Sequence, residues 1–272
     1  MLERRANPVG RAATANVPRI SLGGLRLAVL DIEQTANFMI EAVFPERRAG
    51  RPLYLTSANG EVMARCSSEP MTGRLFRAAD LINADGQPLV AVSRLQSRTP
   101  LPERVATTDL FHVVAEKAQA AGLTFYMFGA DEAENAAAVA NVRKMYPSLR
   151  IVGCSHGYLR GQALRDKVDE INALAPDYLW VALGVPYEQA FVDEFTPQLT
   201  NVGVIKTSGG LFNFLSGSRV RAPIWMQKIG LEWAWRTWQE PRRLFWRYFT
   251  TNPRALFLLF NRSTSTDATP RG

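Results

Sequence analysis

Short apolar runs alternate with longer amphipathic segments from about Ile20 to Gly217. Runs that are rich in β-branched and aromatic residues and bounded by polar or small residues are typical of buried strands. They predict strands over residues 53–56, 124–128, 150–153, 178–183 and 202–206. Between these runs, apolar residues recur at intervals of three and four, which is the helical period. This pattern predicts helices over residues 108–121, 131–146, 162–173 and 188–199.

The alternation of strands and helices predicts an α/β fold in which helices cover both faces of one parallel sheet. Sheets of this kind bind ligands at the carboxyl ends of their strands. In this chain those ends carry polar and small residues. They fall at residues 56–59, 83–86, 129–131, 184–186 and 208–210. We therefore expect the functional site at this edge of the sheet.

The composition changes after Arg219. Residues 222–260 contain five of the six tryptophans, interspersed with arginines, and end in the sequence LFLLF. Indole rings and guanidinium groups suit a bilayer interface, so this segment predicts an appendage that lies on a membrane. Packing onto the core as ordinary amphipathic helices is the alternative, but so many tryptophans favour membrane contact. Pro241 is expected to divide the segment into two helices.

Four parts follow from these patterns. They are a basic, disordered leader (1–18), the α/β core (19–218), the appendage (219–261) and a disordered tail (262–272). The leader lacks the apolar region of a secretory signal, and no run approaches the roughly 18 apolar residues of a spanning helix. We therefore expect a cytoplasmic protein that lies on a membrane without crossing it.

The chain has 272 residues, a net charge of +7 and an ordinary hydrophobic fraction of 47%. Basic residues concentrated at the N-terminus and after Arg219 indicate an acidic partner. A nucleic-acid binder would place its basic residues on a sheet or recognition helix, whereas here they accompany an apolar tail. We therefore expect a lipid partner and no nucleic acid.

The cysteines Cys66 and Cys154 lack zinc spacing and are predicted to be buried thiols. The chain has only two histidines, which argues against a histidine metal site.

Asp85 is the first candidate for chemistry. It follows an apolar run with a polar end and precedes Gly86, which predicts a carboxylate on a tight turn at the cleft. Such a carboxylate can act as a general base, although an Asp-Gly pair is also a common turn and local sequence alone favours that interpretation. Thr56 and Asn59 end a strand and could bind a nucleotide or sugar, or cap the next helix.

Other polar and glycine positions give weaker signals. Asp109 is expected in the first turn of a helix, where it could bind substrate or simply oppose the helix dipole. Arg104 could pair with a diphosphate or with a surface carboxylate. Gly129 ends a strand before a helix, a position that can hold phosphate, but the spaced glycines of a dinucleotide fingerprint are missing. The Asp-Ile-Glu triplet at 31–33 is expected to begin a helix rather than bind metal.

Two further turns could face the cleft. Glu188 and Gln189 follow the most apolar predicted strand, after a Gly-Val-Pro turn. Gly209 and Gly210 leave the backbone open enough to approach a ligand closely, or they form a plain strand-to-helix turn.

In their order and spacing, a set of short motifs resembles the WecG/TagA/CpsF family of bacterial glycosyltransferases, glycosyltransferase family 26. The resemblance runs from about Arg19 to Phe257, and the heptapeptide RAPIWMQ at 221–227 is its most specific part. The other motifs lie at residues 56–59, 84–86, 101–105, 108–109, 125–129, 156–158, 184–189, 209–212, 230–233 and 239–243.

The resemblance implies a Rossmann-like core and an appendage that meets the inner face of the cell membrane. It implies an inverting, metal-independent and cofactor-free transfer from a UDP-sugar to an undecaprenyl-diphosphate-linked sugar. A homo-oligomer is possible. Asp85 would be the base and Thr56 would be the family's threonine near the first strand end. Arg236, Arg242 and Arg243 would close over the site and meet the acceptor diphosphate.

The chain departs from the family pattern at three places. Tyr187-Glu188-Gln189 replaces the usual Lys-Gln-Glu, Asn213 replaces an aspartate, and Thr107 replaces a glycine. These changes shift the expected donor from N-acetylmannosamine toward a sugar such as UDP-glucose, in an exopolysaccharide pathway. The alternative from another class is a non-catalytic, membrane-associated protein that binds a nucleotide or glycolipid.

Overall fold

The computed structural model describes residues 14–44 and 51–263. Its main sheet has the strand order β4-β3-β8-β7-β5-β6, and every neighbouring pair is parallel. The strands are β3 (Leu53–Ala58), β4 (Leu81–Ala84), β5 (Thr124–Gly129), β6 (Arg150–Ser155), β7 (Tyr178–Ala182) and β8 (Val204–Thr207). The predicted parallel sheet is confirmed. Its strand order differs from that of the dinucleotide-binding fold, because here the first and last strands of the sheet lie side by side in the middle.

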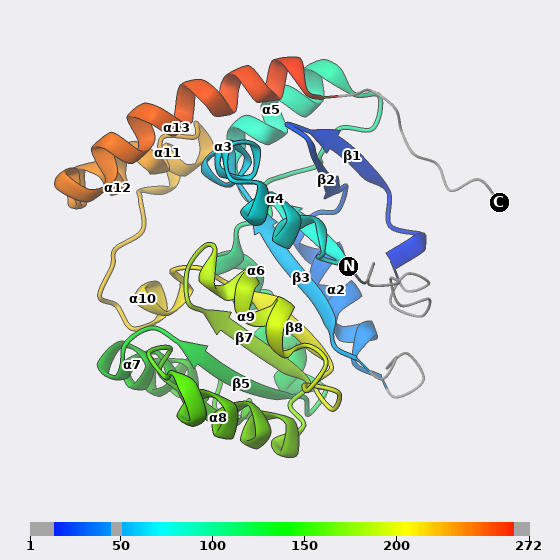
Figure 1. The fold of residues 1–272 in the computed structure, drawn as a ribbon, viewed down its shortest axis with the longest axis vertical. Coiled ribbons are helices and arrows are strands. Elements are labelled where there is room, and N and C mark those ends of the chain that lie inside the picture. Colours follow the sequence, from blue (N-terminus) through cyan, green and yellow to red (C-terminus); the bar gives the residue numbers. More distant parts are fainter. Residues whose placement is uncertain (1–13, 45–50, 264–272) are drawn as a thin grey trace.

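Helices cover both faces of this sheet, as the alternating pattern predicted (Figure 1). One face carries α2 (Ile32–Ala42), α6 (Thr107–Ala120), α7 (Glu132–Met145) and α10 (Leu211–Leu215). The other face carries α8 (Gly161–Leu174) and α9 (Tyr187–Phe195). Aromatic rings fill the first layer, where Phe111 and Trp180 meet edge to face with centroids 4.8 Å apart. Offset and edge contacts of this kind add to the stabilisation from apolar burial.

A small antiparallel hairpin precedes the main sheet and was not expected from the sequence. It consists of β1 (Arg19–Leu22) and β2 (Leu25–Ala28), joined by Gly23 and Gly24 with φ of 57° and 85°. Two positive φ angles suit the turn that matches the twist of a hairpin, and glycine adopts them at little cost. The hairpin shares an apolar core with Leu259 near the C-terminus and with three earlier helices. They are α3 (Gly60–Ser68), α4 (Pro70–Arg77) and α5 (Gln87–Gln96).

The C-terminal segment forms α11 (Ile224–Lys228), α12 (Glu232–Gln239) and α13 (Pro241–Asn261). Pro241 is the first residue of α13, so the predicted break between two helices is confirmed. Helix α13 crosses over α3 and α5 (Figure 1) and buries Ala255, Leu258 and Leu259 there. The appendage is therefore packed onto the core along its last helix. None of the helices in the described residues combines the length and the apolar character needed to cross a bilayer.

Two smaller sequence predictions are settled by the fold. Asp31 caps α2, its carboxylate accepting a hydrogen bond from the backbone nitrogen of Gln34 at 2.6 Å, so the acidic triplet does begin a helix. The prediction of two buried thiols is wrong for Cys154, which lies exposed on the edge strand β6. Cys66 is partly buried, and burial raises the pKa of its thiol to about 12.

Gly129 closes β5 with a φ of 140°, and a Cβ there would overlap the backbone of Ala182 on the neighbouring strand. We expect Gly129→Ala to lower the free energy of unfolding by roughly 3 kcal/mol, because strain and overpacking act together. Gly161→Ala is the control: its φ is 57° but no atom lies within 4 Å, so only about 1 kcal/mol of strain is expected. Equal losses in chemical denaturation would contradict this account.

Candidate active site

Two cavities meet at the carboxyl edge of the sheet. The first, called here the polar cavity, has a volume of about 560 Å³ and lies at the ends of β3, β7 and β8. The second, called the apolar cavity, has a volume of about 520 Å³ and lies between α3, the start of α5 and the appendage helices α12 and α13. The residues that line both cavities are Asn59, Glu61, Asp85, Glu232 and Arg236.

The polar cavity contains three of the predicted turn residues. Glu188, Gly209 and Gly210 all line it. Glu188 is buried, and one of its carboxylate oxygens accepts a hydrogen bond from the backbone nitrogen of Gly209 at 2.9 Å. Burial raises the pKa of Glu188, while the Gly209 hydrogen bond and the charge of Lys206 act in the opposite direction. Glu188 therefore holds together the two turns of this cavity.

The apolar cavity is built from the contact between α13 and the core. Its apolar lining comes mainly from Pro88, Trp233, Pro253, Leu256 and Leu259. Asp85 and Arg104 supply charged groups to the same cavity. An apolar chain and an adjoining charged group could therefore be bound side by side.

Asp85 is half-buried where the two cavities meet, directly after β4. Its backbone nitrogen donates to the carbonyl of Ala58 at 2.8 Å, and its carboxylate accepts a long hydrogen bond of 3.4 Å from the backbone of Thr107. Burial raises the pKa of Asp85, and the charges of Arg104 and Arg236 partly oppose this shift. A raised pKa makes a carboxylate a stronger proton acceptor, which is the property that a general base needs.

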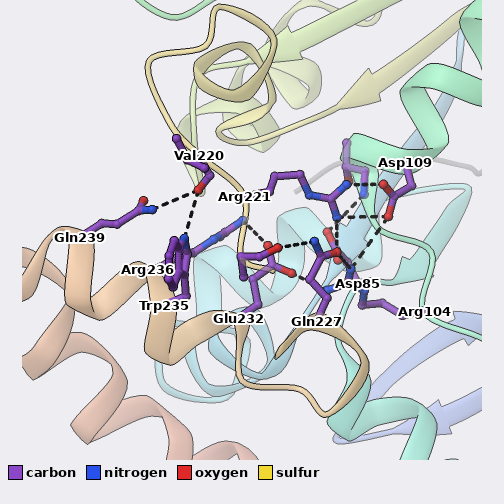
Figure 2. A network of polar contacts seen from close by, with 12 residues as sticks. Asp85, Arg104, Asp109, Val220, Arg221, Gln227, Glu232, Trp235, Arg236 and Gln239 are labelled. Atoms are coloured by element: carbon purple, nitrogen blue, oxygen red, sulfur yellow. Dashed lines mark hydrogen bonds and ion pairs between the residues drawn. The ribbon is translucent and has the colours of Figure 1, made fainter. Parts of the chain in front are cut away.

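Charged groups of the appendage surround Asp85 (Figure 2). Arg104 of the core donates to the carboxylate of Glu232 on α12 at 2.5 Å and to the side-chain oxygen of Gln227 at 3.2 Å. Arg236 pairs with the same Glu232 at 3.3 Å. Although burial opposes it, these two arginines lower the pKa of Glu232, which therefore stays ionised. The arginines beside Asp85 are thus positioned by a carboxylate of the appendage.

Asp109 has a structural partner. It forms an ion pair through both carboxylate oxygens with Arg221, the first residue of the RAPIWMQ motif (Figure 2). Arg221 also donates to Gln227 at 2.8 Å. Asp109 lines neither cavity, and its second, longer ion pair is with Arg104 of the core at 3.9 Å. Together with Arg104 and Glu232, this pair fastens the appendage to the start of α6.

Strand geometry separates Thr56 from the cavities. Thr56 is fully buried and accepts hydrogen bonds from Thr207 at 2.7 Å and from Gln189 at 3.4 Å. Because side chains alternate along a strand, the neighbouring Ser57 points the other way and lines the polar cavity. Gln189 is buried with Thr56 and lines neither cavity. The structure therefore places Ser57, rather than the predicted Thr56, where a ligand can reach it.

Some of the remaining predicted site residues line a cavity and others do not. Asn59 lines both cavities and also caps α3, accepting from the backbone nitrogen of Val62 at 3.0 Å, so both of its proposed roles are compatible. Gly129 is explained by its close approach to β7 and lines neither cavity. Arg242 is exposed and outside both cavities. The side chain of Arg243 lies outside the described residues.

Sequence reasoning missed Thr107, Glu232 and Lys206. Thr107 lines the polar cavity and was noted only as a departure from the family. Glu232 follows the Gly-Leu pair of a family motif, which was the available signal. Lys206 lies fully buried on β8, and its run of apolar neighbours gave no indication of a role.

The fold is of the α/β class, and its two cavities lie at the carboxyl ends of parallel strands, where such sheets bind their ligands. The profile of the glycosyl transferase WecG/TagA/CpsF family matches residues 20–268. The chain therefore belongs to this family and is a glycosyltransferase.

Two relatives carry the same name, N-acetylglucosaminyldiphosphoundecaprenol N-acetyl-beta-D-mannosaminyltransferase. The one from Bacillus spizizenii (strain ATCC 23059 / NRRL B-14472 / W23) is 31% identical over 218 residues, which cover 79% of this chain and 80% of that protein. The one from Bacillus subtilis (strain 168) is 30% identical over 183 residues, which cover 66% of this chain and 68% of that protein.

The ion pair of Asp109 with Arg221 predicts how firmly the appendage is held. Asp109→Ala should weaken the docking of the appendage by about 1 kcal/mol, because the pair is only partly buried. Trypsin should then cleave within residues 219–261 roughly fivefold faster than in the wild type. Glu33→Ala, which removes the exposed pair with Lys117 far from the appendage, is the control. Identical cleavage rates for both variants would contradict a fastening role.

Proposed function

We propose that this chain transfers a sugar from a UDP-sugar to an undecaprenyl-diphosphate-linked saccharide, with inversion and without a metal ion. The observation that carries the proposal is the position of Asp85, whose carboxylate lines both cavities. A base at such a junction can touch a donor bound on one side and an acceptor bound on the other. The names of the two relatives support a polyprenyl-diphosphate-linked acceptor.

The polar cavity suits the donor. Backbone groups of Gly209 and Gly210 and the hydroxyl of Ser57 can hydrogen-bond a nucleotide sugar. Arg65 and Arg219 also line this cavity, and guanidinium groups pair well with phosphate oxygens. We propose that arginines neutralise the diphosphate of the donor and of the departing UDP. The donor sugar is a hexose or an N-acetylhexosamine.

The apolar cavity suits the acceptor. Its apolar walls match the first isoprene units of a polyprenyl chain, and Arg104 and Arg236 lie where the adjoining diphosphate would be bound. Both arginines are held by Glu232, so a diphosphate would have to compete with this carboxylate for them. In this arrangement the acceptor sugar comes next to Asp85.

The proposed step is a single displacement. Asp85 takes the proton of the acceptor hydroxyl as that oxygen forms a bond to the anomeric carbon of the donor sugar. The bond from the anomeric carbon to the diphosphate oxygen breaks, and its electron pair leaves with UDP. Attack from the side opposite the leaving group inverts the configuration.

A peripheral position on the inner face of the cell membrane fits this acceptor. Apolar rings of the appendage are exposed, among them Trp225 at 61%, Trp238 at 74% and Trp246 at 67%. Trp235 differs, because it is half-buried and its indole nitrogen donates to the carbonyl of Val220 at 3.3 Å. Exposed rings on the appendage helices, which also form part of the apolar cavity, would hold the enzyme against the lipid surface. We place the reaction in the synthesis of an exopolysaccharide or another cell-surface polysaccharide.

Asp85→Asn tests the role of the base. It should lower the rate of transfer by about 10²–10⁴-fold, because the amide cannot accept the proton. Calorimetric UDP binding should be unchanged. Asp31→Asn makes the same chemical change at a helix cap outside both cavities and should leave transfer unaffected. Normal turnover by Asp85→Asn would remove the base from the mechanism and favour a binding protein.

Membrane attachment is tested by changing Trp225, Trp238 and Trp246 together to serine in the full chain. Flotation with vesicles of phosphatidylglycerol and phosphatidylethanolamine should be lost, since three large interfacial rings are removed. The control changes Met71 and Leu95, which are exposed on other helices at 60% and 78%, to serine and should float like the wild type. Equal flotation of both variants would refute attachment through the appendage.

A further inference from the structure

Lys206 is a buried amine that the proposed mechanism does not yet use. It lies on β8 between β3 and β7, paired with Leu55 and Trp180, and its side chain is fully buried. Its ammonium donates to the hydroxyl of Ser57 at 2.8 Å and to the carbonyl of Thr207 at 3.0 Å. Within the described residues it forms no direct ion pair. Burying a charged amine that contacts no carboxylate costs free energy, so the presence of Lys206 at this position needs an explanation.

Hydrogen bonds connect Lys206 to Asp85. Ser57, which receives the Lys206 bond, also accepts a hydrogen bond from the hydroxyl of Thr107 at 3.1 Å. The backbone nitrogen of Thr107 in turn donates to the carboxylate of Asp85 at 3.4 Å. Since both acceptor positions of the Ser57 hydroxyl are occupied, its own proton is left for a ligand in the polar cavity.

The charges around Lys206 point to the same carboxylate. Burial lowers the pKa of Lys206 to about 8, and Asp85 and then Glu188 act in the opposite direction. The ammonium is therefore still charged at neutral pH, and Asp85 is the carboxylate that supports this charge most. The charged groups that act most on Asp85 itself are Arg104, Glu232 and Arg236. Lys206 is a buried cation that reaches the polar cavity through the Ser57 hydroxyl, which lines it.

We propose that Lys206 is a positioning residue for sugar transfer: its buried ammonium, acting across Ser57 and Thr107, favours the ionised, proton-accepting form of Asp85. This inference rests on the proposed role of Asp85 as the base. On this account, the chain keeps a buried lysine despite the free energy that its burial costs, because its charge assists the reaction. An apolar residue of similar size would pack as well or better.

The test is the pH dependence of kcat/KM for Lys206→Met. Removing a nearby positive charge disfavours the carboxylate, so the acidic limb of the profile should move up by about half to one pH unit. The variant should therefore be several-fold slower on the acidic limb of the profile, whereas on its plateau the rates of the two proteins should be similar. Lys206→Gln, which can still donate to Ser57 but carries no charge, should show the same shift. Lys117→Met, which removes an amine near the surface, should leave the limb in place.

Stability provides the fold control. Because the folded pKa of Lys206 is lower than that of an unfolded lysine, this group contributes stability that rises as the pH increases from about 8 to the unfolded value. The melting temperature of Lys206→Met should be no lower than that of the wild type at pH 7. The rise above pH 8 that Lys206 produces should be absent from the variant.

The outcomes separate the two claims. An unmoved acidic limb in folded Lys206→Met and Lys206→Gln would overturn the role of Lys206, even if Asp85→Asn is inactive. A shift with Lys206→Met alone would assign the effect to the lost hydrogen bond and overturn the role of the charge. Full activity of Asp85→Asn would instead overturn the base itself.

Discussion

The site depends on a half-buried carboxylate held between groups of opposite charge. Burial pushes Asp85 toward its protonated form, while Arg104 and Arg236 pull it toward the ionised form. Neither arginine belongs to Asp85 alone, since Glu232 binds both. The pKa of the Asp85 carboxyl therefore depends on the appendage as well as on the sheet, and it should respond to whatever occupies the apolar cavity.

This dependence gives the appendage a role at the site as well as in the proposed membrane attachment. Its first part is fastened to the core through Arg221 and Asp109, and its last helix packs on α3 and α5. Glu232 lies between these two anchoring points, so it is held over the carboxyl edge of the sheet. The segment that we propose to face lipid thus also completes the charged surroundings of Asp85.

The alternation of apolar and amphipathic segments sufficed to predict the parallel sheet and its covering helices. The hairpin was missed because its strands have only four residues each, although their apolar residues alternate with polar ones and Gly23-Gly24 is a turn signal. Asp85, Glu188, Gly209 and Gly210 could be found because ligand sites of parallel sheets gather at strand ends.

Side-chain direction was the part that the sequence could not supply. Strand β3 is covered on both faces, so its residues show no alternation of polarity, and Thr56 could not be told from Ser57. Strand β8 is buried in the same way, so Lys206 stands in an apolar run that gives no sign of its role. The partners of Asp109 and Glu232 lie more than a hundred residues away along the chain, and only the folded structure reveals such pairs.

The most direct measurement is a structure of the enzyme with UDP and a short-chain polyprenyl-diphosphate sugar. The account predicts UDP in the polar cavity, the lipid along α13 in the apolar cavity, and an acceptor hydroxyl about 3 Å from the Asp85 carboxylate. Both ligands bound in one cavity, or Asp85 beyond hydrogen-bonding reach of every acceptor hydroxyl, would contradict it.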